Sequence, residues 1–133
     1  MGGLIVLDAS AALETVLQTA VGARLEARLA KGSTLVPAHF DAELLSALRR
    51  LARARRLAPW HAALAVVLVA RLPFDRVPLA PLLVDAFAMR DRCSAGDALY
   101  VVLAHRLDAT LITTDGPLTR AARGLAKIEL VSL

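Results

Sequence analysis

The sequence contains a single cysteine, Cys93, so no disulfide can form within the chain. Disulfide-stapled scaffolds, the usual solution for small secreted domains, are therefore excluded, and a reduced thiol fits a cytoplasmic protein. The chain has 133 residues, of which 57% are hydrophobic, and this is enough to bury a full core without covalent help. We expect one domain spanning residues 1–133.

Long apolar runs are also missing. The longest uninterrupted one, residues 62–70, is far shorter than the ~20 residues that a membrane-spanning helix needs. Residues 4–7 are apolar, but no basic residue precedes them and Asp8 interrupts the run, so they do not resemble a secretion signal. We therefore expect a cytoplasmic protein with no membrane partner. Its high hydrophobic content predicts that some apolar surface faces a second copy or another protein.

Aromatic residues make up only 4% of the chain, so stacking of bases on aromatic rings is not an obvious binding mode. The three histidines, His39, His61 and His105, show no spacing typical of zinc ligands. Arginine, in contrast, is abundant and supplies 14 of the 16 basic residues, in a chain of formal net charge +4. Because its planar guanidinium donates two parallel hydrogen bonds, arginine binds phosphate well, which matters wherever arginines cluster.

Short apolar strands alternate with stretches of helical periodicity along the whole chain. Strands are expected at residues 4–7, 34–36, 76–77, 110–113 and 128–131. Helices are expected at residues 11–17, 22–31, 40–57, 59–71, 82–91, 94–107 and 115–123. Right-handed crossovers then give an α/β fold with a mostly parallel sheet and helices on both faces. The helix at 59–71 is apolar almost all round, which predicts that it is largely buried.

Acidic residues stand where these strands and helices meet. Asp8 follows the first strand directly, and Asp115 follows the strand at 110–113. Because ligands of open parallel sheets bind beyond the carboxyl ends of the strands, both carboxylates are expected at that edge. Glu43 and Asp97 lie in the first turns of two helices whose N-termini face the same edge. Four carboxylates from distant positions are therefore expected to converge.

Such a cluster calls for a cation, because like charges at close range repel strongly. Oxygen-only ligands favour Mg²⁺ or Mn²⁺, whereas zinc prefers histidine or cysteine. We take Asp8, Asp97 and Asp115 as candidate metal ligands. Glu43 is the fourth candidate catalytic acid, which would orient a water molecule or complete the metal shell.

Each acid also has a purely structural interpretation. Asp115 can cap the helix that follows it, and Asp97 can complete a capping box with Ser94. Glu43 can compensate the dipole of its helix. Asp8 is the hardest to explain in this way, because a carboxylate that ends a buried central strand usually has a functional partner. Among the remaining acids, Asp41, Asp85 and Asp108 are interpreted as caps or surface charges. Asp91 is interpreted as an outer participant in the site, because it comes shortly before the helix that carries Asp97.

The densest basic cluster lies on the helix expected at residues 40–57. Its members are Arg49, Arg50, Arg53, Arg55 and Arg56. At about 100° per residue, Arg50 projects within about 20° of Glu43, two turns along, so a phosphate backbone bound there would reach the acids. Arg49, Arg50 and Arg53 are candidate nucleic-acid ligands. A solvated helix face that compensates the dipole at its C-terminal end explains the cluster equally well.

Four stretches of the sequence resemble the motifs of a known family. They are residues 6–11 (VLDASA), 37–48 (PAHFDAELLSAL), 97–104 (DALYVVLA) and 111–118 (LITTDGPL). Each motif is short, but in this order they resemble a PIN domain over essentially the whole chain. At this length the chain looks most like the PIN-domain toxins of type II toxin–antitoxin pairs, the VapC group.

The resemblance implies a PIN-like three-layer α/β fold and a Mg²⁺- or Mn²⁺-dependent endoribonuclease that acts on cellular RNA. It also implies a homodimer that a small antitoxin protein neutralises. The residues that it assigns to the site are the metal-binding acids Asp8, Glu43, Asp97 and Asp115, with Ser10 and Thr113 as supporting hydroxyls. One departure is Ala47, which stands where the family often has an asparagine that would support the second-motif acid.

Two other functions stay open at this point. A non-catalytic module that binds RNA or a protein would also suit the arginine cluster and the high apolar content, and it would not need Mg²⁺. An aspartate-based phosphatase also places an aspartate after its first strand. It requires a second aspartate two residues later, where this chain has Ser10.

Overall fold

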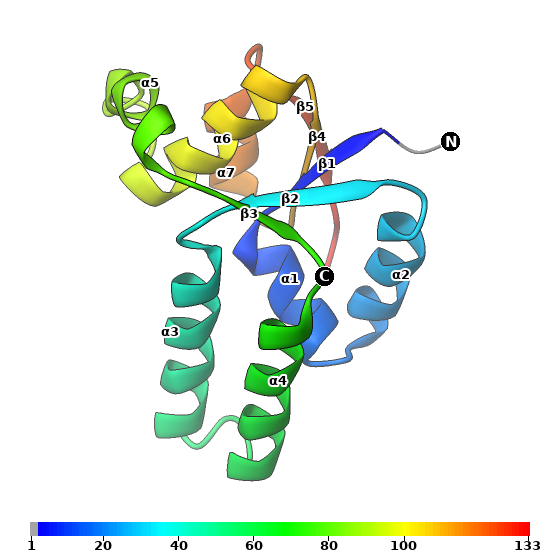
Figure 1. Ribbon diagram of the computed structural model, residues 1–133. Helices are drawn as coiled ribbons and strands as arrows, with labels where there is room; N and C mark the ends of the chain where they lie inside the picture. Colours follow the sequence, from blue (N-terminus) through cyan, green and yellow to red (C-terminus); the bar gives the residue numbers. More distant parts are fainter. Residues whose placement is uncertain (1–2) are drawn as a thin grey trace.

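Five short parallel strands form the centre of the computed structural model, which describes residues 3–133 (Figure 1). They are β1 (Leu4–Leu7), β2 (Ser33–Pro37), β3 (Asp75–Val77), β4 (Thr110–Thr113) and β5 (Lys127–Leu130). In space they follow the order β3-β2-β1-β4-β5, and every neighbouring pair is parallel. The chain adds strands in one direction from β1 and in the other from β4. The edge beyond these two strands is therefore the topological switch point, where open parallel sheets bind ligands.

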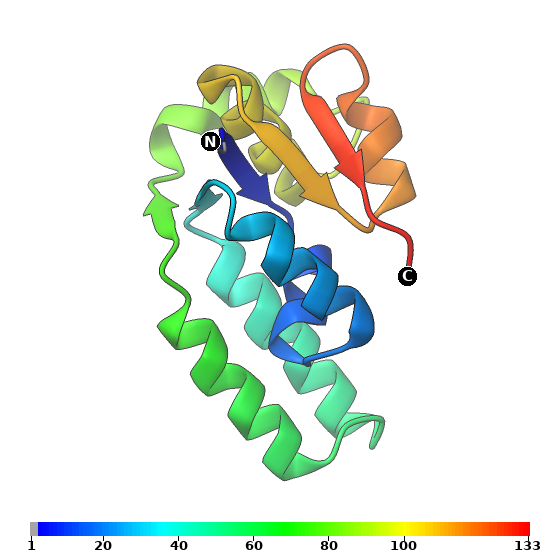
Figure 2. The ribbon, with the colours of Figure 1, turned by 90° about the vertical axis from the view of Figure 1, so that its right-hand side faces the viewer.

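Helices cover both faces of this sheet. They are α1 (Ala9–Val16), α2 (Ala20–Leu29), α3 (Phe40–Arg53), α4 (Pro59–Arg71), α5 (Leu83–Ala88), α6 (Ala95–Leu107) and α7 (Gly116–Ala122), with a 3-10 turn η1 (Ala80–Leu82). The helices α5, α6 and α7 lie on one side of the sheet and α1 to α4 on the other (Figures 1 and 2). The expected three-layer α/β architecture is confirmed.

The core is densest where α6 crosses the central strands. The β1 residues Ile5, Val6 and Leu7 are almost fully buried, as a strand covered on both faces should be. Helix α6 contacts β1, β2 and β4, and it is buried continuously over residues 98–104. The ends of β1 and β4 therefore belong to the buried centre of the molecule, while the first turn of α6, residues 95–97, is partly exposed at the edge of the sheet.

The expected elements are all present, and their ends differ by a few residues. The largest difference concerns α3, which was expected to reach residue 57 but ends at Arg53. The reason is local, because Arg55 adopts a left-handed conformation with φ 55° and turns the chain into α4. Helix α2 begins earlier than expected because the Thr19 hydroxyl accepts a hydrogen bond from the Gly22 backbone at 3.0 Å and caps it.

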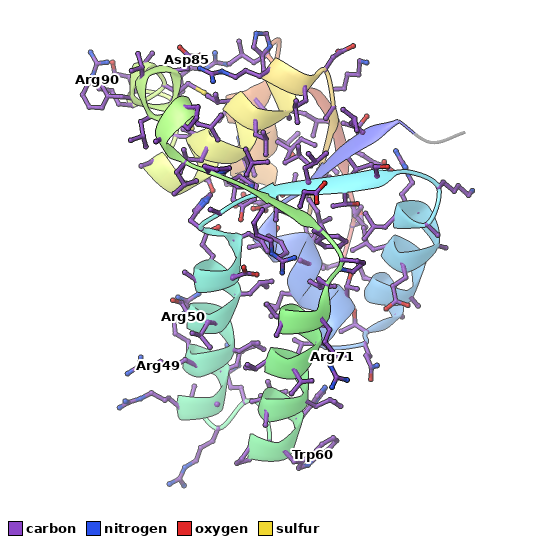
Figure 3. All side chains as sticks on the ribbon, viewed as in Figure 1. Arg49, Arg50, Trp60, Arg71, Asp85 and Arg90 are labelled. Carbon is purple, nitrogen blue, oxygen red and sulfur yellow. The ribbon has the colours of Figure 1, made fainter. Side chains whose placement is uncertain are left out.

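The expectation that α4 is largely buried is wrong. Only Ala65 and Val69 are buried on this helix, and several large apolar side chains are exposed. Helices α3 and α4 form a hairpin that extends well beyond the sheet, so α4 is covered on one side only (Figure 2). Trp60, near the far end of the hairpin, is 70% exposed (Figure 3). Within residues 3–133, no helix is long and apolar enough to cross a membrane.

Candidate active site

Asp8 stands at the junction of the central strand β1 and helix α1, and only 5% of it is exposed. Its backbone occupies the N-cap position of α1, but its side chain makes no capping hydrogen bond. Instead, Oδ2 accepts hydrogen bonds from Ser10 Oγ at 2.5 Å and from Thr113 Oγ1 at 2.8 Å. Both hydroxyls named from the sequence therefore contact this carboxylate and fix its orientation.

The same two hydroxyls also fix the loop that follows β4. Thr113 Oγ1 accepts a hydrogen bond from the Asp115 backbone at 2.9 Å, and Ser10 Oγ accepts one from the Thr114 backbone at 3.3 Å. Because each hydroxyl donates to Asp8 while it accepts from this loop, the ends of β1 and β4 are tied together. Asp8 and Asp115 are thus held at the same edge of the sheet.

Glu43 reaches this edge from the first turn of α3. Its Oε1 accepts a hydrogen bond from the Tyr100 hydroxyl of α6 at 2.6 Å, and His39 Nε2 lies 3.5 Å from the same oxygen. Burial, followed by the hydrogen bond to Glu43 and its charge, raises the pKa of Tyr100 well above its ordinary value. The phenol therefore stays protonated and acts as a donor to Glu43.

Asp97 lies in the first turn of α6, which Ser94 caps. The Ser94 hydroxyl accepts a hydrogen bond from the Asp97 backbone at 3.2 Å, but the Asp97 carboxylate makes no return bond. The capping box considered from the sequence is thus only half formed. The Ser94 hydroxyl lies close enough to the Asp97 carboxylate to lower its pKa, and no basic side chain among the described residues pairs with this carboxylate.

Asp115 is the N-cap of α7, where its Oδ1 accepts a hydrogen bond from the Leu118 backbone at 3.1 Å. The structural interpretation offered for this residue is therefore confirmed. It does not exclude a second role, because Oδ2 makes no hydrogen bond within residues 3–133. One oxygen of Asp115 holds the helix, and the other is free to bind a ligand.

The carboxylates at this edge lie close enough for their charges to alter the ionisation of Asp8 and Asp97. Burial raises the pKa of Asp8, the hydrogen bonds from Ser10 and Thr113 oppose that rise, and the charges of Glu43 and Asp115 add to it. Burial likewise raises the pKa of Asp97, and so do the charges of the other three acids, while a hydrogen bond from Ser94 opposes the rise. The chain thus brings together four acids separated by up to about a hundred residues in sequence, into one field of negative charge.

Acids elsewhere in the protein are neutralised by basic side chains. Three that were interpreted as structural form ion pairs of 3.2 Å or less: Asp41 with Arg76, Asp85 with Arg106 and Asp108 with Lys127. In the described part of the chain, no arginine or lysine pairs with any of the four acids at the sheet edge, and only His39 approaches one of them. Their charge is left for a ligand to neutralise.

The donors at this edge are suited to a hard divalent cation, because they are all oxygens. Within residues 3–133, no group of three or more acidic, histidine or cysteine side chains is arranged so that it could hold a metal ion. Mg²⁺ does not require such a cage, because it retains several of its waters and is commonly bound through one or two carboxylates. The donor chemistry and the uncompensated charge therefore fit an ion that is held partly through water.

The candidate nucleic-acid ligands Arg49, Arg50 and Arg53 are exposed on α3, and none of them forms an ion pair within the described residues. Arg49 and Arg50 extend outward from the helix (Figure 3). Residues 40–71, which form the α3–α4 hairpin, contain six arginines and only two acids. The whole formal net charge of +4 is thus concentrated in this hairpin, while the rest of the chain is balanced.

Two residues that surround Glu43 were not recognised from the sequence as part of the site. His39 was considered only as a zinc ligand, and Tyr100 appeared only within a motif. A signal was present, because His39 lies four residues before Glu43 and Tyr100 lies three residues after Asp97. These spacings place each of them on the same helix face as a site acid.

Residues 5–124 match the family model described as PIN domain, and the chain belongs to that family. Its relatives place it in the VapC group. It is 42% identical over 130 residues to Ribonuclease VapC12 of Mycobacterium tuberculosis, which covers 97% of this chain and 100% of that protein. It is 41% identical over 118 residues to Ribonuclease VapC3 of the same species, which covers 88% of this chain and 86% of the relative.

Solved structures share the fold at low sequence identity. One is VapBC2 from Rickettsia felis bound to a DNA fragment from their promoter, with a TM-score of 0.66 and 13% identity over 95% of this chain and 97% of that one. Another is PAE2754 from Pyrobaculum aerophilum, with a TM-score of 0.67 and 22% identity over 93% and 81% of the two chains. A third is FitAcB from Neisseria gonorrhoeae, with a TM-score of 0.65 and 17% identity over 93% of this chain and 95% of that one.

Proposed function

We propose that this protein is a Mg²⁺- or Mn²⁺-dependent endoribonuclease and the toxin of a type II toxin–antitoxin pair, acting on cellular RNA in the cytoplasm. The observation that carries the proposal is a group of four carboxylates, none of them paired with an arginine or lysine among the described residues, at the switch point of a parallel sheet. The ribonucleases among its relatives support the same reaction class.

Asp8, Asp97 and Asp115 are the residues that would hold the cation. When bound, a divalent cation lowers the pKa of a water molecule and neutralises charge on the phosphate. Other groups of the chain orient the carboxylates that would bind it. The hydroxyls of Ser10 and Thr113 hold Asp8, and the start of α7 holds one oxygen of Asp115. Asp97 contributes a carboxylate that forms no ion pair within residues 3–133.

Glu43 is the residue placed to orient the attacking water. Its Oε1 is occupied by Tyr100, which leaves Oε2 to accept a hydrogen bond from that water. The reaction would then depend mainly on positioning and on charge stabilisation. Asp8→Asn should abolish cleavage and leave the fold intact.

Arg49, Arg50 and Arg53 would hold the RNA backbone, because exposed guanidinium groups neutralise phosphates and release counterions. They lie further along the same helix as Glu43, so a strand bound along α3 reaches the acids. Contacts of this kind carry no sequence information by themselves, and affinity through them should fall steeply with salt.

The direct test is cleavage of end-labelled RNA by the purified protein in Mg²⁺, in Mn²⁺ or in EDTA, with Asp8→Asn in parallel. We expect cuts that require the metal and disappear in the variant. Cuts that persist in EDTA or in Asp8→Asn would contradict the assignment. A protein that binds RNA equally well in EDTA and never cuts it would be the non-catalytic binding module instead.

We further propose that the protein forms a homodimer through α5. This short helix exposes Leu83, Val84 and Phe87, and Val84 is 81% exposed. Beside them, Arg106 forms an ion pair with Asp85 at 2.7 Å, and the Arg90 guanidinium lies over the Phe87 ring. An apolar face with few unpaired charges can meet an identical face with little repulsion, as a two-fold interface requires.

The α3–α4 hairpin is better suited to an antitoxin. An apolar pocket between the two helices is lined by Leu45, Leu48, Val66 and Val69. Because the arginines of the hairpin are in excess, a second copy of this chain would be repelled there, whereas an acidic amphipathic segment would be attracted. Such a segment would also cover the arginines that we propose for RNA, and this would neutralise the toxin.

A further inference from the structure

Two side chains from different helices lie next to the same oxygen of Glu43, Oε1. The Tyr100 hydroxyl of α6 donates to Oε1 at 2.6 Å, which is the length of a strong hydrogen bond to a carboxylate. His39 Nε2, at the start of α3, lies 3.5 Å from the same oxygen. Tyr100 is fully buried, so its ring has no freedom to move the hydroxyl away.

The hydrogen-bond network also defines the state of His39. Its Nε2 lies 3.1 Å from the Gly96 carbonyl oxygen, which can only accept. Nε2 therefore carries the proton and donates, while Nδ1 is buried without a partner. The imidazole packs against the Tyr100 ring, with 4.9 Å between the ring centroids. The two rings thus support each other. Tyr100 gives its hydrogen to Glu43 Oε1, whereas His39 gives its Nε2 hydrogen to the Gly96 carbonyl and only approaches Oε1, at 3.5 Å.

Gly96 borders the other oxygen. A Cβ atom at this position would lie 3.1 Å from Glu43 Oε2 and 3.8 Å from His39 Nε2. A contact of 3.1 Å is tighter than a carbon and an oxygen normally make, so a methyl group would displace Oε2. The absence of a side chain at Gly96 therefore keeps space for this oxygen beside the start of α6, one residue before Asp97.

We propose that Tyr100 is a positioning residue that holds Glu43 by Oε1, so that Oε2 faces the other three acids across the space that Gly96 leaves open. His39 is a second positioning residue, which acts through its contact with the Tyr100 ring and its hydrogen bond to the Gly96 carbonyl. The inference rests on the nuclease function proposed above. It adds that the two oxygens of the Glu43 carboxylate have different roles. Oε1 is held in place, and Oε2 takes part in the reaction. Neither Tyr100 nor His39 touches the substrate.

Tyr100→Phe removes the anchoring hydroxyl and keeps the buried ring. We expect kcat for RNA cleavage to fall about tenfold or more, with KM changed less than about twofold, because loss of positioning acts on the reacting geometry and not on RNA binding. The matched control is Thr15→Val, which removes another buried hydroxyl, one that has no hydrogen-bond partner. It should leave kcat unchanged. Wild-type kcat in Tyr100→Phe would overturn the proposal.

A double-mutant cycle shows whether Tyr100 acts through Glu43. If it does, adding Tyr100→Phe to Glu43→Gln should cause no further loss in single-turnover cleavage, because the group being positioned is already disabled. An equal tenfold loss in both backgrounds would mean that Tyr100 acts by another route, and the proposal would be wrong.

His39 can be tested with a pair of variants. His39→Gln retains an N–H donor at a similar distance from the backbone, whereas His39→Leu retains the volume and removes the donor. We expect His39→Gln to cleave within about threefold of the wild type and His39→Leu to lose about tenfold in kcat. Equal rates in the two variants would show that only the bulk of the ring matters.

Gly96→Ala tests the space on the other side of the carboxylate. Alanine is the better helix former, so the thermal midpoint of unfolding should stay the same or rise, while kcat should fall about tenfold as Oε2 is displaced. A variant that is both stable and fully active would contradict the role given to Oε2.

A spectroscopic test does not depend on cleavage. The chain has one tyrosine, so protein labelled with ¹³Cζ-tyrosine gives a single signal that reports on Tyr100. Glu43→Gln should shift this signal, and the exposed Asp91→Asn should not. If wild-type protein fails to cut RNA but the signal shifts, the function proposed above fails and the anchoring contact stands. An unshifted signal in Glu43→Gln overturns the inference whatever the activity.

Discussion

At the scale of single residues, the acids at the sheet edge are tolerated at an energetic cost. Burial and mutual repulsion raise the pKa values of Asp8 and Asp97 above the ordinary 3.8 of an aspartate. The hydroxyls of Ser10 and Thr113 offset part of this cost for Asp8, and the Ser94 hydroxyl offsets part of it for Asp97. A fold under selection for stability alone would not retain an unpaired Asp97, which is the expected signature of a site built for a ligand.

Asp97→Asn should therefore raise stability in a pH-dependent way. Because the folded state holds the Asp97 proton more tightly than the unfolded state, the wild type loses stability as the pH rises from about 3.8 through the raised pKa. The variant lacks this contribution. Its thermal midpoint should exceed that of the wild type by a few degrees at neutral pH, and the difference should shrink towards pH 4. Differential scanning calorimetry across this range measures it.

Asp91→Asn is the control for this comparison. The sequence suggested an outer role in the site for Asp91, but the residue is exposed, precedes the same helix and forms no ion pair within residues 3–133. Its thermal midpoint should follow that of the wild type at every pH. A pH-independent difference in Asp97→Asn, or a loss of stability at neutral pH, would show that Asp97 is not under electrostatic strain in the folded protein.

At the scale of elements, the site is built from the junctions between strands and helices. Asp8 and Asp115 stand between a strand and the following helix, and Glu43 and Asp97 occupy first helical turns. All of these junctions lie at the carboxyl edge because the sheet is parallel. Asp115 shows how one residue can both cap a helix and offer a ligand to the site, since one of its oxygens caps α7 and the other makes no hydrogen bond within residues 3–133.

The two roles of Asp115 can be separated with two variants. Asparagine caps a helix about as well as aspartate, whereas alanine does not, at a cost of about 1 kcal/mol. Asp115→Asn should keep the thermal midpoint within about 1 °C of the wild type, and Asp115→Ala should lower it by about 4 °C. Both should lose metal-dependent cleavage. If Asp115→Asn retained full activity, the residue would be a cap and nothing more.

Elements whose formation depends on a short local stretch of sequence were predictable. The apolar β-branched runs of β1 and β4, and the aspartate that follows each, predicted the sheet centre and two of the four acids. The exposure of α4 was not predictable, because apolar composition does not reveal whether neighbours cover a helix. Only the three-dimensional arrangement, in which the α3–α4 hairpin extends beyond the sheet, shows that neighbouring elements leave one side of α4 uncovered.

The partners of the acids were predictable only in part. Ser10 and Thr113 lie within two residues of Asp8 and Asp115, so their motifs contain them. The contact between Glu43 and Tyr100 joins residues that are 57 positions apart. It depends on how α3 and α6 approach each other, and helical periodicity does not define that approach.

At the scale of the whole molecule, charge and apolar surface are distributed unevenly. The α3–α4 hairpin carries the net positive charge together with an apolar pocket, while α5 presents an apolar face with few unpaired charges. The two surfaces therefore suit different partners. Large exposed apolar residues on both α4 and α5 agree with the expectation that the high hydrophobic content serves protein contacts.

Phe87→Glu should convert the protein to a monomer if α5 forms the dimer interface. Phe87 is 68% exposed, so a charge there costs the isolated fold little but would be buried in the dimer. Multi-angle light scattering should give 14.1 kDa for the variant and twice that mass for the wild type. Leu133→Glu, which alters an exposed leucine outside both surfaces, should remain dimeric. A dimeric Phe87→Glu would place the interface elsewhere.

The measurement that tests the central claim most directly is the rate of RNA cleavage as a function of Mn²⁺ for wild type, Asp97→Asn and Asp91→Asn. These two aspartates lie six residues apart, and only Asp97 shares the field of the other acids. We predict metal-dependent cleavage by the wild type and Asp91→Asn at equal rates, and a loss of at least about a hundredfold in Asp97→Asn. Equal cleavage by all three proteins, or cleavage that EDTA does not abolish, would contradict a metal-dependent site at this sheet edge.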